Sequence, residues 1–124
     1  GTVLDLDSSA PGQLTVSVTG QGGGWVGGLT LMSLSTDRHV SLGNVFGVEA
    51  DGLTEAVISL PAMEGNVFAF TNTANPALYP NAPYVFPAPV AAVLQGRTLD
   101  AVAVFYDASG SIVDVSNVDR VTVQ

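Results

Sequence analysis

A single histidine, His39, is the only imidazole in this 124-residue sequence and the natural candidate for a general base. It lies beside Asp37, and Ser33, Ser35 and Ser41 are the nearby hydroxyl groups that could act as a nucleophile. A serine hydrolase needs serine, histidine and an orienting acid within hydrogen-bond reach. No nucleophile-elbow motif accompanies these residues. The sequence therefore favours a polar loop histidine, and we predict that the protein is not an enzyme.

The acidic residues raise the question of a calcium site, because calcium takes about six to eight oxygen ligands. The aspartates concerned are Asp5, Asp7, Asp100, Asp107, Asp114 and Asp119. Their spacing matches neither an EF-hand loop nor a dense Asp-x-Asp-x-Asp run. Asp107 is better explained by a turn, and Asp114 by solvent exposure on a strand. We predict no metal site and no cofactor, and a bound calcium ion is the alternative.

Aromatic side chains form the third group of candidates: Trp25, Tyr79, Tyr84 and Phe86. Trp25 lies in the glycine-rich stretch GQGGGWVGG, and the other three lie in a proline-rich stretch. Aromatic faces can stack on the apolar side of a sugar, but Trp and Tyr also fill cores and anchor protein interfaces. We favour packing or a protein interface for these residues, with a carbohydrate-binding module as the alternative.

The elements that must position these residues are predicted to be strands, and residues 99–123 form the organising β-hairpin. Its first arm, LDAVAVFY, carries apolar side chains on both faces, so we expect it inside a sheet that is covered on both sides. The residues from Asp107 to Gly110 suit a four-residue hairpin turn. The second arm is SIVDVSNVDRVTV.

Upstream strands are predicted at residues 2–7, 13–19, 29–34, 53–60 and 66–72, with a weaker one at 40–48. Prolines at positions 76, 80, 83, 87 and 89 predict an extended crossover over residues 74–89. Residues 90–94 are either a short strand or one helical turn. No segment of about eleven residues has the 3.6-residue spacing of a stable amphipathic helix. These elements describe one β-sandwich domain over residues 1–124.

The segments PGQLTVSVTG and TLDAVAVFYDASGSIVDVSNVDRVTVQ resemble an early strand and the last two strands of a known kind of module. These are the immunoglobulin-like and fibronectin-III-like modules of prokaryotic surface and virion proteins. The resemblance implies an all-β, immunoglobulin-like β-sandwich of about seven to eight antiparallel strands with a Pro-rich crossover. The chain lacks the cysteine pair of antibody domains, and Trp25 lies in a glycine loop, so no functional residue is carried over.

The charge balance excludes several classes of function. Eleven acids face three arginines and no lysine, so the net charge is −8 and nucleic acid and anionic membranes are poor partners. The absence of lysine excludes a Schiff base and a Lys–Asn isopeptide bond, and the absence of cysteine excludes disulfides and thiolate chemistry. No apolar run approaches the ~18 residues of a membrane helix, so membrane insertion is not predicted.

The low content of charged residues indicates a role in an assembly. Charged residues make up 11% of the chain, against about a quarter in typical domains. A weakly charged surface resists self-association poorly. We therefore predict a structural module that binds copies of itself or a scaffold protein in an extracellular filament, a cell-surface layer or a virion. Strand donation to a neighbour is one mechanism, with candidates Val3, Leu4, Leu6, Val121 and Val123.

Overall fold

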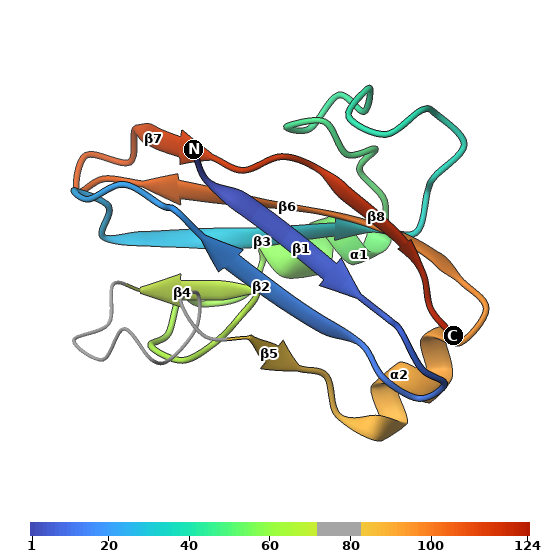
Figure 1. The fold of residues 1–124 in the computed structure, drawn as a ribbon. Coiled ribbons are helices and arrows are strands. Elements are labelled where there is room, and N and C mark those ends of the chain that lie inside the picture. The colour runs from blue at the N-terminus through green and yellow to red at the C-terminus, as the bar shows by residue number, and fades with distance from the viewer. Residues whose placement is uncertain (72–82) are drawn as a thin grey trace.

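The computed structural model describes residues 1–71 and 83–124 and shows a mostly β chain with two antiparallel sheets (Figure 1). The first sheet has the order β1-β2-β5, formed by Val3–Asp7, Thr15–Thr19 and Tyr84–Val85. The second has the order β4-β3-β6-β7, and β8 pairs with the other half of β6. Its strands are β3 (Gly27–Ser33), β4 (Ala69–Thr71), β6 (Thr98–Tyr106), β7 (Ile112–Val115) and β8 (Asp119–Thr122). The predicted all-β character is confirmed.

Strand β6 is buried on both faces, as its apolar pattern predicts. Leu99, Ala101, Ala103 and Phe105 pack into the main core with Val16 and Val18 of β2. On the opposite face, Val102 and Val104 pack with Leu31, Val48 and Val57. The second arm of the predicted hairpin is divided into β7 and β8, and both strands pair with β6.

Residues 53–60 form a helix, so the predicted strand there is wrong. Helix α1 spans Gly52–Ile58 and begins with a capping box. The Asp51 side chain accepts hydrogen bonds from the Leu53 and Thr54 N–H groups, at 3.0 and 3.2 Å, and the Thr54 hydroxyl accepts one from the Asp51 N–H. This cap stabilises a first helical turn, and Leu53 and Val57 then fall on one helix face. The apolar residues of this segment also alternate as in a strand, but the capping box and the shared face of Leu53 and Val57 favour the helix.

Asp51 also fixes α1 to the edge of β3. Its carboxylate accepts a hydrogen bond from the Leu34 N–H at 2.9 Å, and the Thr54 hydroxyl donates to the Met32 carbonyl at 2.7 Å. Burial raises the pKa of the Asp51 carboxyl, but the hydrogen bonds from Thr54 and Leu34 outweigh burial, so this pKa lies below its ordinary value. Side chains at the start of α1 thereby provide hydrogen-bond partners for backbone groups at the C-terminal end of β3, beyond its pairing with β4.

The described part of the proline-rich segment is not an extended crossover. Tyr84–Val85 pairs with β2, and helix α2 spans Ala88–Leu94. Pro89 is accommodated because the first turn of a helix needs no N–H donor. For residues 90–94 the helical alternative is therefore confirmed. The preceding part of the predicted crossover, including Tyr79, lies largely outside the described residues.

The other predicted strands are confirmed with shifted bounds, except for residues 40–48. The strand expected at 66–72 is reduced to Ala69–Thr71, and β3 begins two residues early, at Gly27. Glycine is required at position 28, because an added Cβ would lie 2.5 Å from the Val104 carbonyl oxygen and from the Phe70 ring. Residues 40–48 form a tight turn with isolated bridges Gly43↔Gly47 and Val45↔Val48, not a strand. Among the described residues, no helix is long and apolar enough to span a membrane.

Candidate functional site

An apolar groove lies between α1 and α2, and we call it the α1–α2 groove. It has a volume of about 380 Å³. The residues that line it come from β3, α1, the segment before β4, the segment after β5, and α2: Met32, Leu53, Phe68, Phe86, Pro89, Val90, Val93 and Leu94. Met32 and Phe86 belong to the buried core, so the groove is an opening onto the core itself.

Phe68 lines the groove and also two further depressions beside it. Its ring makes edge-to-face contacts with Tyr84 at 6.4 Å and with Phe86 at 5.9 Å between centroids. One adjoining depression, of about 210 Å³, runs along α1 past Ala56 and Leu60. The other, of about 340 Å³, runs past residues 63–67 and Tyr84. Phe68 is the lining residue that all three depressions share.

The rim of the groove leaves large apolar side chains in contact with water. Val93 is 80% exposed, and Val90 and Leu60 are each more than one-third exposed. Every described residue that lines the groove is apolar, and none of these residues is an acid, a base or a nucleophile. Such a surface binds apolar groups by removing them from water, at roughly 25 cal/mol per Å² of apolar area buried.

The aromatic residues predicted as a binding surface are not brought together as expected. Trp25 is 8% exposed, with its ring edge-to-face against Phe70 at 5.8 Å and against Phe105 at 5.3 Å. Its faces are therefore not available to stack on a sugar. Tyr84 is half-buried and contacts Phe86, whereas Tyr79 lies outside the described residues. Of the four candidates, Phe86 lines the groove directly and Tyr84 lies beside it.

Both terminal strands complete the sheets of their own chain. In β1, Leu4 and Leu6 are buried, Val3 is exposed, and all three pair with β2. At the other end, Val121 is half-buried in β8, which pairs with β6, and Val123 is buried just after it. Donation of either strand to a neighbour therefore requires that these pairings first be broken.

The outer edge of β1 is closed by two side chains from the segment around β8. The Asn117 side chain accepts a hydrogen bond from the Leu4 N–H at 2.8 Å and donates one to the Leu4 carbonyl at 3.0 Å. Asp119 accepts from the Leu6 N–H at 2.8 Å. Asn117 thus imitates the hydrogen bonding of a neighbouring strand. This arrangement protects an edge that would otherwise be open to strand addition.

Replacement of Asn117 with alanine is expected to lower the free energy of unfolding by about 1–2 kcal/mol, because the Leu4 N–H and carbonyl lose their partners. The measurement is urea denaturation followed by tryptophan fluorescence. Asn44→Ala, at an exposed position in the 40–48 turn, is the control and should leave the midpoint almost unchanged. Equal stabilities of the two variants would show that Asn117 does not secure β1.

Two of the candidate hydrolase serines, Ser33 and Ser35, have partners other than His39. His39 is exposed, the Ser33 hydroxyl donates to the Glu49 carbonyl, and the Ser35 hydroxyl donates to Asp51 at 3.3 Å. Because a hydroxyl has a single proton to donate, neither of these serines is oriented by His39. The described contacts therefore assemble no nucleophile and base at this position.

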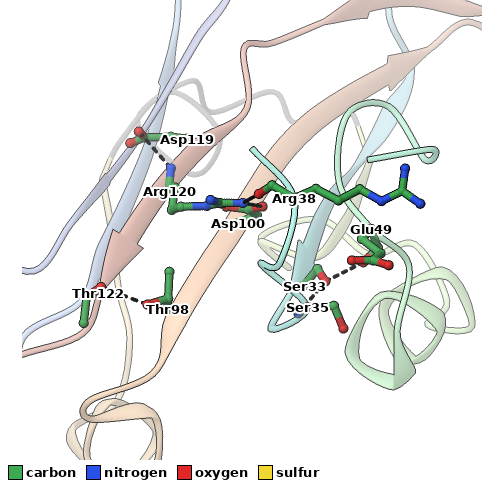
Figure 2. A network of polar contacts seen from close by, with 9 residues as sticks. All are labelled: Ser33, Ser35, Arg38, Glu49, Thr98, Asp100, Asp119, Arg120 and Thr122. Carbon is green, nitrogen blue, oxygen red and sulfur yellow. Dashed lines mark hydrogen bonds and ion pairs between the residues drawn. The ribbon is translucent and has the colours of Figure 1, made fainter. Parts of the chain in front are cut away.

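An ion pair between β6 and β8 forms the centre of the polar network in Figure 2. The Arg120 guanidinium donates to both oxygens of Asp100, from Nε at 2.7 Å and from Nη2 at 2.9 Å. The same Nη2 donates to the Arg38 carbonyl at 2.7 Å. The hydrogen bond to Asp100 raises the pKa of Arg120 above its ordinary value. This pair holds the start of the loop that connects β3 to α1.

Two further candidate calcium ligands, Asp107 and Asp114, each accept hydrogen bonds from separate parts of the chain. Asp107 accepts hydrogen bonds within its own turn, from the Ser109 N–H and hydroxyl and the Ser111 N–H. Asp114 accepts from the Thr2 hydroxyl and the Gly22 N–H. Hydrogen bonds from these groups leave the pKa of each carboxyl below its ordinary value, for Asp114 against the opposing effect of burial. Over residues 1–71 and 83–124, no three acidic or histidine side chains cluster to hold a metal ion.

Apart from Phe86, sequence reasoning missed the described residues that line the groove: Met32, Leu53, Phe68, Pro89, Val90, Val93 and Leu94. One signal was present: Asp51 and Thr54 form a capping-box spacing, and Leu53, Val57 and Leu60 follow at helical intervals.

Comparisons of the chain with protein-family models, with curated proteins and with solved structures each find no match. The interpretation of the groove therefore depends on its own geometry.

Proposed function

We propose that this chain is a non-enzymatic structural module that assembles with copies of itself, in an extracellular filament, a surface layer or a virion. The observation that carries the proposal is the α1–α2 groove, where the core opens to water and every described lining residue is apolar. A groove of this kind is a typical protein-binding surface, because covering it removes exposed apolar area from water. The low content of charged residues also favours assembly, because a weakly charged surface resists self-association poorly.

The sandwich is proposed to be immunoglobulin-like on the basis of its strand order. The order β1-β2-β5 corresponds to strands A, B and E of such sandwiches, and the order β4-β3-β6-β7 corresponds to C′, C, F and G. Trp25, just before β3, packs on Phe105 of β6, which parallels the buried tryptophan of strand C. This architecture alone does not decide the function, because one such fold hosts many unrelated functions.

The size of the purified protein in solution tests this function. Sedimentation velocity from micromolar to near-millimolar concentration should show species larger than a monomer whose share rises with concentration. Val93→Asp, which places a charge in the groove, should shift the protein to monomer. Val3→Asp, at an exposed valine on β1 outside the groove, is the matched control and should assemble like the parent. A protein that stays monomeric over the whole range contradicts the proposal.

A further inference from the structure

Strand β1 lies beside residues 114–119, the segment that runs from the end of β7 to the start of β8. Figure 1 shows β1 and β8 side by side and running in the same direction. The contacts between the two segments follow one parallel register: Thr2 with Asp114, Leu4 with Asn117, and Leu6 with Asp119. We call this row of contacts the β1 seam. In each contact a side chain of the 114–119 segment takes the place that the backbone of a neighbouring strand would have.

The seam and β2 hold opposite edges of β1. The N–H groups of successive residues in a strand point to opposite edges. Because the Leu4 and Leu6 N–H groups point to the seam, the Asp5 N–H between them points to β2, where Asp5 pairs with Ser17. Strand β1 is therefore held by backbone pairing along one edge and by side chains along the other.

Two of the three side chains in the seam are carboxylates, which become neutral in acid. Asp119 accepts a hydrogen bond from the Leu6 N–H at 2.8 Å, and Asp114 accepts one from the Thr2 hydroxyl. A hydrogen bond to an ionised carboxylate is roughly twice as strong as one between neutral groups. Protonation of the two aspartates therefore weakens both contacts, whereas the Asn117 amide does not titrate.

The surroundings of Asp114 link the seam to pH in a definite direction. Burial raises the pKa of this carboxyl, but hydrogen bonds from Thr2 and Gly22 and the charge of the Gly1 amino group outweigh burial, so the pKa lies below its ordinary value. A carboxyl whose pKa is lowered by folding stabilises the fold at higher pH. This contribution is lost as the pH falls through the lowered pKa.

The other charged side chains of the strands around the seam have separate positions. Asp100 of β6 and Arg120 of β8 bind each other. Asp5 and Asp7 of β1 are exposed on the face opposite the buried leucines of that strand. Strand β2 has the sequence TVSVT, which contains no titratable side chain. The two carboxylates of the seam are therefore the groups that connect it to pH.

We infer that the β1 seam is an acid-sensitive latch, closed at neutral pH and opened when Asp114 and Asp119 become protonated. Opening leaves β1 paired with β2 but frees the Leu4 and Leu6 N–H groups along the other edge. An added strand would need these N–H groups, so the closed latch protects the edge and acid exposes it. The latch does not depend on the α1–α2 groove or on assembly.

Amide hydrogen exchange measured by NMR from about pH 7 to about pH 2.5, across the ordinary titration of aspartate, tests the latch. After correction for the intrinsic effect of pH, the protection of the Leu6 amide should fall about tenfold or more, as expected when a hydrogen bond to a charged group is lost. The Leu4 amide should follow, although its partner Asn117 does not titrate, because an opened seam separates both residues from their partners. The Asp5 amide, on the β2 side, should keep its protection.

Two results for the parent protein would overturn the inference. A loss of protection at Leu6 alone would mean that one hydrogen bond weakens while the seam stays closed. An equal loss at Leu4, Leu6 and Asp5 would mean that β1 leaves the sheet or that the whole domain unfolds.

The double change Asp114→Asn and Asp119→Asn separates the charge from the hydrogen bond. An amide oxygen still accepts from the Thr2 hydroxyl and the Leu6 N–H but does not titrate, so this variant should keep the seam protected in acid. Asp5→Asn with Asp7→Asn, at exposed positions of the same strand, is the matched control and should open like the parent. If the seam variant opens in acid as the parent does, the two carboxylates do not control the latch. If it does not fold, the measurements on the parent decide the inference.

Discussion

Replacement of Trp25 with alanine is expected to lower the free energy of unfolding by about 3–5 kcal/mol, the cost of removing a large aromatic side chain from a packed core. Trp25 is 8% exposed and lies against the rings of Phe70 and Phe105. Its removal leaves a cavity between the two sheets, since the neighbouring rings cannot collapse into the space. Because domains of this size have a total stability of about 5–15 kcal/mol, this loss is a large share of the whole.

Urea denaturation followed by far-ultraviolet circular dichroism measures this effect, because the variant lacks the only tryptophan. Phe46→Ala is the control: it removes an aromatic ring that is half-exposed on the loop of residues 37–48, between β3 and α1, and should change the midpoint little. Trp25→Phe should lie between the parent and Trp25→Ala. If Trp25→Ala unfolds at the same urea concentration as the parent, the ring is not a core residue, and a surface role such as glycan stacking returns.

Replacement of Arg120 with alanine is expected to lower the free energy of unfolding by about 3 kcal/mol. The Asp100 side chain is 4% exposed, so without Arg120 its carboxylate would remain buried and unpaired. The expected loss lies at the low end for buried pairs, because the Arg120 side chain is itself 27% exposed. Loss of the hydrogen bond to the Arg38 carbonyl adds to the effect by releasing one end of the 37–48 loop.

A double-mutant cycle identifies the origin of this loss. Asp100→Ala combined with Arg120→Ala should destabilise the protein less than the sum of the two single changes, because the double variant has no unpaired buried charge. Arg97→Ala, at an exposed arginine after α2, is the control and should be nearly neutral. Additive single effects would mean that the two side chains contribute independently, contrary to the geometry of the pair.

The predicted variants fall into two groups, one that affects the stability of the fold and one that affects assembly. Trp25 and Arg120 act on the stability of one copy, whereas Val93 is exposed and belongs to the proposed contact between copies. Variants of Trp25 and Arg120 should therefore change urea midpoints, and Val93→Asp should change particle size. This separation allows a failure to fold to be distinguished from a failure to assemble.

The strands of the fold were largely predictable, and the helices were not. The alternation of β2 and the two apolar faces of β6 are strong local patterns, and both strands are observed. Helices α1 and α2 are seven residues long, which is too short for a helical period to stand out from strand alternation. The end of α1 at Ser59 and its start at Asp51 were set by hydrogen bonds to particular backbone groups, not by a run of apolar residues.

The candidate site was less predictable than the fold. Phe86 was identified from its residue type, but the groove also needs Met32, Leu53 and Val93, which belong to three other segments of the chain. No local sequence pattern predicts the role of Asn117, because this role depends on Leu4, which is 113 positions away in the sequence. An amide side chain becomes an edge-closing group only when the fold places it beside a strand with unpaired backbone groups.

By itself, the sequence determined the period of each strand, the two-sided burial of β6 and the weakly charged surface. These properties depend on the order of neighbouring residues or on composition, and side-chain direction along a strand repeats every second residue. The tertiary structure alone decided that Trp25 lies in the core, that side chains close the edge of β1, and that a groove opens between two short helices. Each of these three features forms where segments that are distant in the sequence come into contact. Which segments come into contact depends on the order of the strands in the two sheets and on the path of the loops that connect the strands.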